Sequence, residues 1–171
     1  MFWFRAVFSA LFLCQALPAQ AQTMALPDLT GAVILTVSGL DPQDFPGGRI
    51  ELDRARLAAI GSSEITTSTI WTDEGTHRFK GVMLRDLVDF LNIKAGALRL
   101  RALNDYAVEI PTEDVTQIAP ILAYEMDGAI MTVRDKGPVW VMYPFDDGPE
   151  YRTDTIFSRS IWKLDRIEVL N

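Results

Sequence analysis

Apolar positions along this chain recur mostly with the two-residue period of half-buried strands, and only a few segments show helical spacing. An Asp-Gly pair at 127–128 joins two such runs and predicts a hairpin, because Asp and Gly tolerate the positive φ angles of a type I′ turn. Strands are predicted over residues 32–38, 50–52, 64–71, 77–79, 98–103, 106–110, 121–126, 129–134, 139–143 and 161–170.

Helices are predicted at fewer places. Asp53 precedes residues 54–60 as a capping residue, and Gly61 ends that helix. Residues 83–91 form an amphipathic pattern, and a short helical turn begins at Thr112. The fold class is therefore α+β, a strand-dominated mixed sheet with two or three short helices. Inward spacing predicts a core of Leu84, Leu87, Val88, Leu91, Val108, Ile110, Ile121, Leu122, Val139 and Val141.

The first 21 residues have the order of a secretory signal peptide. Arg5 precedes an apolar run over residues 6–13, which is shorter than the roughly 20 residues that span a bilayer. The small residues of Ala19-Gln20-Ala21 then provide a cleavage site. We expect residues 1–21 to be removed and residues 22–171 to form a single periplasmic domain with no membrane insertion. An uncleaved N-terminal anchor is the alternative.

Composition narrows the classes of function. Removing Arg5 leaves 15 basic against 23 acidic residues, a formal charge of −8, which argues against nucleic acid and anionic membrane surfaces as partners. The single cysteine, Cys14, belongs to the predicted signal peptide, so disulfides and cysteine metal sites are excluded from the mature chain. His77 is the only histidine, and the acidic loop 146–154 lacks the order of a calcium loop, so we expect no metal site.

Five segments occur in an order typical of one family. Residues 79–88 (FKGVMLRDLV) are similar to W-x-G-V-x-L-x-x-L-L, and residues 104–111 (NDYAVEIP) to x-D-G-Y-x-x-x-I-P. Residues 121–128 (ILAYEMDG) are similar to I-L-A-x-x-x-N/D-G. Residues 137–144 and 162–169 are similar to the closing G-P-x-R-x-x-x-P and K-W-x-x-x-I-E elements. Over residues 60–171 the chain thus resembles the sulfite-oxidase-type molybdopterin-binding domain, which implies that core fold and molybdopterin as the family's cofactor.

The departures from this family bear on function. The family holds molybdenum through a cysteine thiolate on or after the strand before the W-x-G-V segment, but residues 65–71 contain no cysteine. A hydroxyl is a far poorer ligand for a soft metal than a thiolate. The family's Gly before Tyr106 is also missing, and Trp140 stands near the place of its Arg. We therefore expect no cofactor and no catalytic residue. The alternative is a molybdenum-dependent oxidoreductase in which Ser68 replaces the thiolate.

The resemblance also implies where a ligand would lie, because the family's pterin crosses loops at one edge of the sheet. By position, these loops are residues 67–71, 104–106 and 134–140, with residues 151–159 closing the site. Aromatic side chains suit a planar ligand and arginines suit an anion. The predicted ligand-binding residues are Trp71, Asp105, Tyr106, Arg134, Trp140, Arg152 and Arg159.

Besides the oxidoreductase, two functions remain open at this point. In a non-enzymatic binding module, an anionic or planar small molecule could occupy the predicted site, or a partner such as a membrane-bound signalling or redox protein could contact it. In a purely structural interaction domain, the aromatic residues would instead belong to the core and the arginines to a solvated rim.

Overall fold

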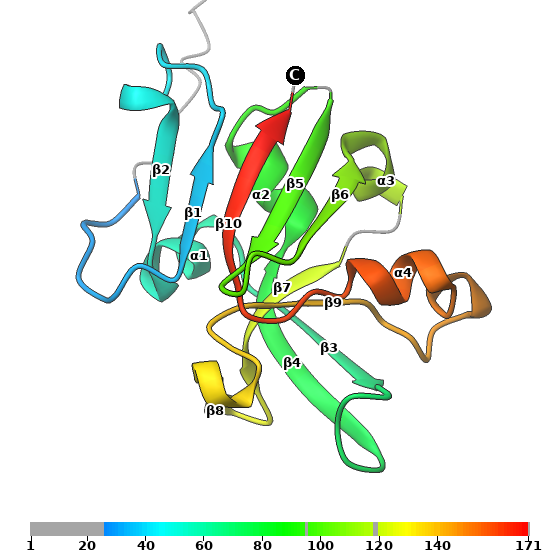
Figure 1. The fold of residues 1–171 in the computed structure, drawn as a ribbon. Helices are drawn as coiled ribbons and strands as arrows, with labels where there is room; N and C mark the ends of the chain where they lie inside the picture. Colours follow the sequence, from blue (N-terminus) through cyan, green and yellow to red (C-terminus); the bar gives the residue numbers. More distant parts are fainter. Residues whose placement is uncertain (1–25, 95, 118–119, 171) are drawn as a thin grey trace, which may run out of the picture.

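The computed structural model describes residues 26–94, 96–117 and 120–170, and two sheets dominate its fold (Figure 1). The first has the strand order β2-β1-β10-β5-β6, in which β1 and β10 pair in parallel and the other neighbours are antiparallel. Its strands are β1 (Leu35–Ser38), β2 (Arg49–Leu52), β5 (Ala97–Ala102), β6 (Ala107–Pro111) and β10 (Leu164–Leu170).

The second sheet is antiparallel and has the order β3-β4-β7-β8, with β9 also paired to β7. Its strands are β3 (Ser63–Ser68), β4 (Thr76–Met83), β7 (Ile121–Met126), β8 (Ala129–Ile130) and β9 (Trp140–Met142). The predicted α+β, strand-dominated fold class is confirmed.

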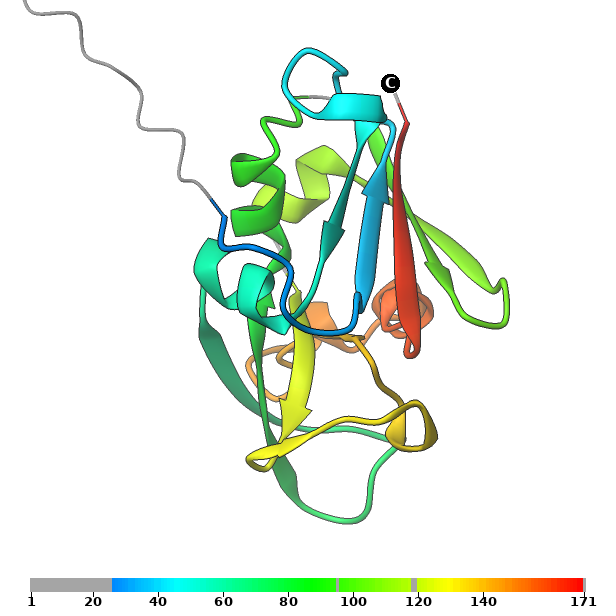
Figure 2. The same ribbon diagram turned by 90° about the vertical axis from the view of Figure 1, so that its left-hand side faces the viewer.

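Short helices connect and cover the sheets. They are α1 (Arg54–Ile60), α2 (Leu84–Phe90), α3 (Thr112–Gln117) and α4 (Asp154–Arg159), with single 3₁₀ turns at Pro46–Gly48, Val133–Asp135 and Pro149–Tyr151. Figure 2 shows α2 and α3 on the same face of the first sheet. The last helix, α4, lies at the end of that sheet beside β6 (Figure 1). No helix among the described residues is long and apolar enough to span a membrane.

Alternation along the strands decides what is buried. In β5, Leu98 and Leu100 face the core, while Arg99 and Arg101 lie on the outer face of the first sheet. All of the predicted core residues are buried except Val108, which is half-buried. The two-residue and helical spacings therefore identified the inward faces correctly.

Gly81 sets how closely β4 approaches β7. A Cβ added at Gly81 would lie 2.0 Å from the carbonyl oxygen of Leu122, which no side chain could tolerate. The pairing of β4 with β7 shifts register between Lys80 and Gly81, at the same place. Gly81, the glycine of the family-like F-K-G-V segment, thus allows the backbones of β4 and β7 to approach each other closely.

Several predicted boundaries were wrong, and local geometry explains each difference. The strand predicted from residue 161 begins only at Leu164, because Lys163 has φ 56° and turns the chain. The strand after the hairpin ends at Ile130, and Thr132 then caps a 3₁₀ turn. The loop predicted over 146–154 leads directly into α4, a helix that was not predicted from the sequence. Thr153 caps α4 by accepting from the backbone N–H of Ile156.

The predicted signal peptide, residues 1–21, and Cys14 within it lie outside the described residues. The prediction that residues 22–171 form one domain is not tested by the arrangement of the described segments, and it stays a prediction.

Asp53 ties the start of the described chain to the first helix. Its carboxylate caps α1 by accepting from the backbone N–H of Arg56, at 2.9 Å, and accepts from those of Thr30 and Gly31 at 3.1 and 2.8 Å. Asp53 is buried, and its pKa lies below the ordinary value because the N–H groups of Arg56 and Gly31 stabilise the carboxylate.

We expect Asp53→Ala to lower the free energy of unfolding by about 1–2 kcal/mol at neutral pH, through loss of the cap and the tether. The depressed pKa makes this contribution fully present above about pH 4, and it is lost as the pH falls through the folded-state pKa. Urea denaturation at several pH values measures it. Asp53→Asn, which retains a capping oxygen, is the matched control. Equal stability of Asp53→Ala and wild type at pH 7 would contradict the tether.

Candidate functional site

A cavity of about 290 Å³ lies where three segments distant in sequence converge. They are the β3–β4 connection, the β5–β6 turn and the stretch from α4 into β10. These correspond to three of the four loops that the resemblance implied, whereas no residue of the 134–140 segment lines this cavity. The lining residues are Trp71, Ala102, Asn104, Tyr106, Phe157, Ser158, Ser160, Ile161 and Trp162.

Trp71 forms the centre of an aromatic cluster at the cavity wall. Its ring centroid lies 5.8 Å from those of Phe157 and Trp162, 5.9 Å from Phe145 and 6.2 Å from Trp140, and all four contacts are edge-to-face. Edge-to-face pairs at such distances are favourable because the positive ring edge meets the negative face. The cluster therefore fixes the orientation of Trp71 from four sides.

The structure corrects the expected place of Trp140. This residue is fully buried on β9, so it lies behind Trp71 and cannot form an open wall of the cavity. Its Nε1 donates to the carbonyl oxygen of Ser160 at 3.2 Å, and its ring packs edge-to-face on Phe79 at 5.6 Å. Trp140 is a core residue whose indole N–H holds the end of α4 against the second sheet.

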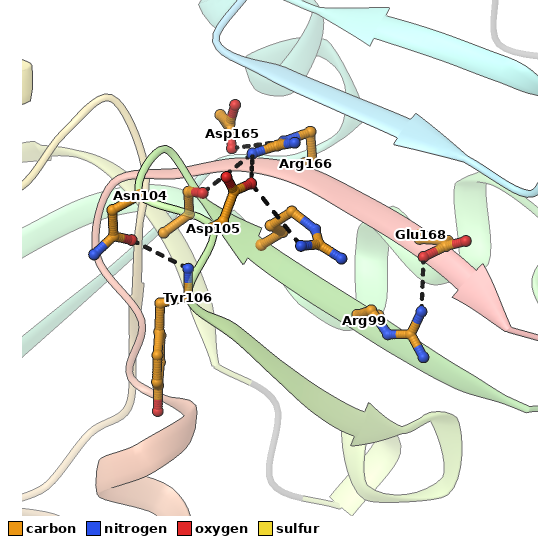
Figure 3. Close-up of polar contacts among 9 residues, drawn as sticks. Arg99, Asn104, Asp105, Tyr106, Asp165, Arg166 and Glu168 are labelled. Carbon is orange, nitrogen blue, oxygen red and sulfur yellow. Dashed lines mark hydrogen bonds and ion pairs between the residues drawn. The ribbon is translucent and has the colours of Figure 1, made fainter.

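Tyr106 lies at the cavity mouth, as expected, and is 50% exposed. It follows a tight turn in which Asp105 has φ 64° and its backbone N–H donates to the carbonyl of Ala102. Aspartate tolerates this left-handed conformation better than most residues, so the turn forms without the glycine that the family has here. Figure 3 shows the Tyr106 ring pointing toward α4, where its hydroxyl lies 3.5 Å from the carbonyl oxygen of Ser158.

Asp105, also predicted as a ligand-binding residue, points away from Tyr106 in Figure 3. Its carboxylate lies 3.0 Å from the guanidinium of Arg166 and 3.9 Å from that of Arg101 on the outer face of the first sheet. Asp165 and then Asp105 raise the pKa of Arg166 by accepting its hydrogen bonds. Asp105 does not line the cavity, and its contacts position the turn that carries Tyr106.

The three predicted arginines lie apart from the cavity. Arg152 forms an ion pair with Asp146 and donates to the carbonyl oxygen of Phe145 at 2.7 Å. Arg159 forms an ion pair with Asp114 at 2.9 Å, with its side chain 15% exposed. Arg134 lies exposed in the 3₁₀ turn after β8 and makes no ion pair with another described residue. None of the three lines the cavity, so the positive charge expected there is not present.

The segment that corresponds to the family's metal-binding cysteine ends β3. There, the hydroxyl of Ser68 donates to Asp146 Oδ1 at 2.7 Å, and its backbone N–H also donates to that carboxylate. Thr67 is fully buried, and its hydroxyl oxygen accepts from the backbone N–H of Asp146 at 3.2 Å. Ser68, Asp146 and Arg152 thus form one hydrogen-bonded unit next to the aromatic cluster.

The single histidine makes a local contact. His77 Nδ1 lies 2.7 Å from Asp127 Oδ2 in the hairpin turn, and this hydrogen bond raises the pKa of His77 and lowers that of Asp127. Among the described residues, no group of three or more His, Cys, Asp and Glu side chains could hold a metal ion.

The segment 151–159 was expected to close the site, but Phe157, Ser160 and Trp162 were not predicted as site residues. They line the cavity because α4 and the turn at Lys163 bring them opposite Trp71. Trp162 was assigned to a strand as part of a family-like segment. The Thr153-Asp154 capping signal was the one local sign of the helix that positions all three.

The Ser68–Asp146 contact can be tested through the pKa of the Asp146 carboxyl. The pKa of Asp146 lies below its ordinary value, chiefly because of the Ser68 backbone N–H, then the Ser68 hydroxyl, and Arg152 lowers it as well. We expect Ser68→Ala and Arg152→Ala each to raise this pKa, because each removes a group that stabilises the carboxylate. In both variants it should stay below the ordinary value, because the backbone donor remains. A carboxyl-carbon NMR titration measures this. A wild-type Asp146 that titrates above pH 4 would contradict the geometry.

Comparison with known proteins identifies the family. No curated protein matches this chain. The family model described as the oxidoreductase molybdopterin binding domain matches residues 54–151, which is more than half of the chain. The match spans α1 through β9, including the β3–β4 connection and the β5–β6 turn at the cavity, and it confirms the resemblance seen in the sequence. This chain belongs to the oxidoreductase molybdopterin-binding domain family.

Proposed function

We propose that this chain is an exported, non-catalytic member of its family that binds a small ligand or a partner protein at the aromatic cavity. The observation that carries the proposal is the Ser68–Asp146 contact. A hydroxyl committed to a carboxylate occupies the segment in which the family places its metal thiolate.

The residues present do not fit a thiolate-bound molybdenum cofactor. The Ser68 hydroxyl is protonated at neutral pH and already donates to Asp146, so it offers the metal neither a thiolate nor a free anionic oxygen. The cofactor also carries a phosphate, which needs cationic partners. The nearby cation, Arg152, is paired with Asp146, and no charged side chain lines the cavity.

The alternative is a molybdenum-dependent oxidoreductase in which Ser68 ligates the metal. One observation favours it: Ser68 ends β3 and is only half-buried, so its hydroxyl could be reached from solvent. Ionisation of that hydroxyl would require a base. Asp146 is a weak one because its own pKa is lowered.

Metal analysis separates the two functions. We expect protein purified from cells that make the molybdenum cofactor to contain far less than stoichiometric molybdenum, because no thiolate is present to hold it. A family member with the metal-binding cysteine, purified in parallel, is the positive control. Ser68→Cys tests whether the thiolate is the missing element. Stoichiometric molybdenum in the wild-type chain would overturn the non-catalytic proposal.

Export is the second part of the proposal. Arg5, the apolar run over residues 6–13 and the Ala19-Gln20-Ala21 site support cleavage after Ala21. We expect mass spectrometry of the periplasmic fraction to find a chain that begins at Gln22. Ala21→Pro, which blocks the cleavage site, should leave the precursor. A mature mass that retains residues 1–21 would contradict export with cleavage. A membrane-bound signalling or redox protein remains the proposed type of protein partner for the exported chain.

A further inference from the structure

We infer that the cavity binds a small molecule through an uncharged aromatic group of one or two rings, and not through an anionic group. This inference deepens the proposed function and rests on it. It follows from the cavity's size, its wall, its hydrogen-bonding groups and the charges around it.

The size and the wall suit a ring. A volume of about 290 Å³ lies at the lower end for small-molecule sites and accommodates a single or fused aromatic group. The wall consists chiefly of Trp71, Tyr106, Phe157 and Trp162, and Trp71 already meets its neighbours edge-to-face. A bound ring can extend the same arrangement, which adds a favourable contact that a saturated group of equal size would not make.

The hydrogen-bonding groups of the lining favour a ligand that carries an acceptor. The hydroxyls of Ser158 and Ser160 donate within α4, to the carbonyls of Thr155 and Ile156, each at 2.8 Å. By contrast, the indole N–H groups of Trp71 and Trp162 donate to no other described residue. These two residues can therefore offer donors to a neutral oxygen or nitrogen acceptor on the ligand.

The charges disfavour an anion as the ligand. No charged side chain lines the cavity, and the cations Arg152, Arg159 and Arg166 have carboxylate partners. The ammonium of Lys136 lies 5.5 Å from the ring centroid of the buried Trp140 and does not line the cavity. The mature chain would carry a formal charge of −8. An anion placed in this cavity would lose hydration without gaining a counter-ion, which is unfavourable.

A quaternary ammonium group is the main competing ligand, because aromatic side chains can surround a cation. Burying a cation is costly unless an anionic group pairs with it, and no carboxylate lines the cavity. The geometry therefore favours the neutral ring.

The test uses benzyl alcohol, benzoate and benzyltrimethylammonium, which share one phenyl ring and differ in charge, with cyclohexylmethanol as the saturated analogue. Binding to the purified chain is followed through the indole N–H resonances of Trp71 and Trp162 in ¹H–¹⁵N spectra. The buried Trp140 N–H, which donates to Ser160, is the internal reference for an intact fold. We expect benzyl alcohol to bind roughly tenfold more tightly than benzoate and about threefold more tightly than cyclohexylmethanol.

Variants locate the binding. Tyr106→Ala should weaken benzyl alcohol binding about threefold to tenfold, whereas Tyr106→Phe, which retains the ring, should not. Ile130→Ala removes an exposed apolar side chain outside the lining, and Arg152→Ala removes a cation predicted from sequence; both should leave binding unchanged. Tyr106 is half exposed, so its substitution leaves the core intact.

Each contrary result has a distinct meaning. If benzoate binds most tightly and Arg152→Ala abolishes its binding, the cavity prefers an anionic ligand, and this inference is overturned. If benzyltrimethylammonium binds most tightly, the cavity prefers a cationic group, and the inference of an uncharged ligand is wrong. If no probe shifts the Trp71 and Trp162 resonances, the aromatic ligand class is wrong. The non-catalytic function would still be judged by the molybdenum content.

Discussion

The packing of four aromatic rings around Trp71 is the contact on which the functional end of this molecule depends. The rings come from segments that share no backbone pairing with the β3–β4 connection: β9, the loop after it, α4 and the residues before β10. Short helices such as α4 have little intrinsic stability and depend on tertiary packing. Because Phe157 packs on both Trp71 and Phe145, the cluster supplies that packing and also forms the cavity wall.

Contacts that hold the fold together lie away from the segment in which we expected the family's metal ligand. The buried Leu84, Leu87 and Val88 of α2 belong to the core, and β4 meets β7 through Gly81; neither contact involves Thr67 or Ser68 at the end of β3. At that end, the polar groups satisfy one another, since Ser68 and Thr67 pair with Asp146, and Asp146 with Arg152. Among the described residues, no buried side-chain nitrogen or oxygen lacks a hydrogen-bond partner.

Local signals in the sequence were enough for elements that depend on neighbouring residues. Asp53 and Gly61 delimit α1 as predicted, and Asp127-Gly128 forms the hairpin turn with both φ angles positive. Burial of Trp140 and exposure of Trp162 could not be predicted, because the packing of each side chain depends on segments distant in sequence, such as the one that carries Trp71. The arginines were misplaced for a related reason. Arg159 pairs with Asp114, which is distant in sequence, and composition does not reveal which cations are already paired.

The distribution of charge over the first sheet sets the cavity apart from the rest of the surface. On the outer face, Arg99 bridges Glu109 and Glu168 at 2.9 and 3.1 Å, and Figure 3 shows Arg166 and Asp105 continuing this paired surface toward the β5–β6 turn. Exposed ion pairs of this kind contribute little stability, but they keep a sheet face solvated and disfavour apolar association. Beyond the turn the character changes, since Tyr106 and Trp162 are both exposed and line the cavity. The aromatic surface at the cavity therefore lies beside a charged face that an apolar ligand would avoid.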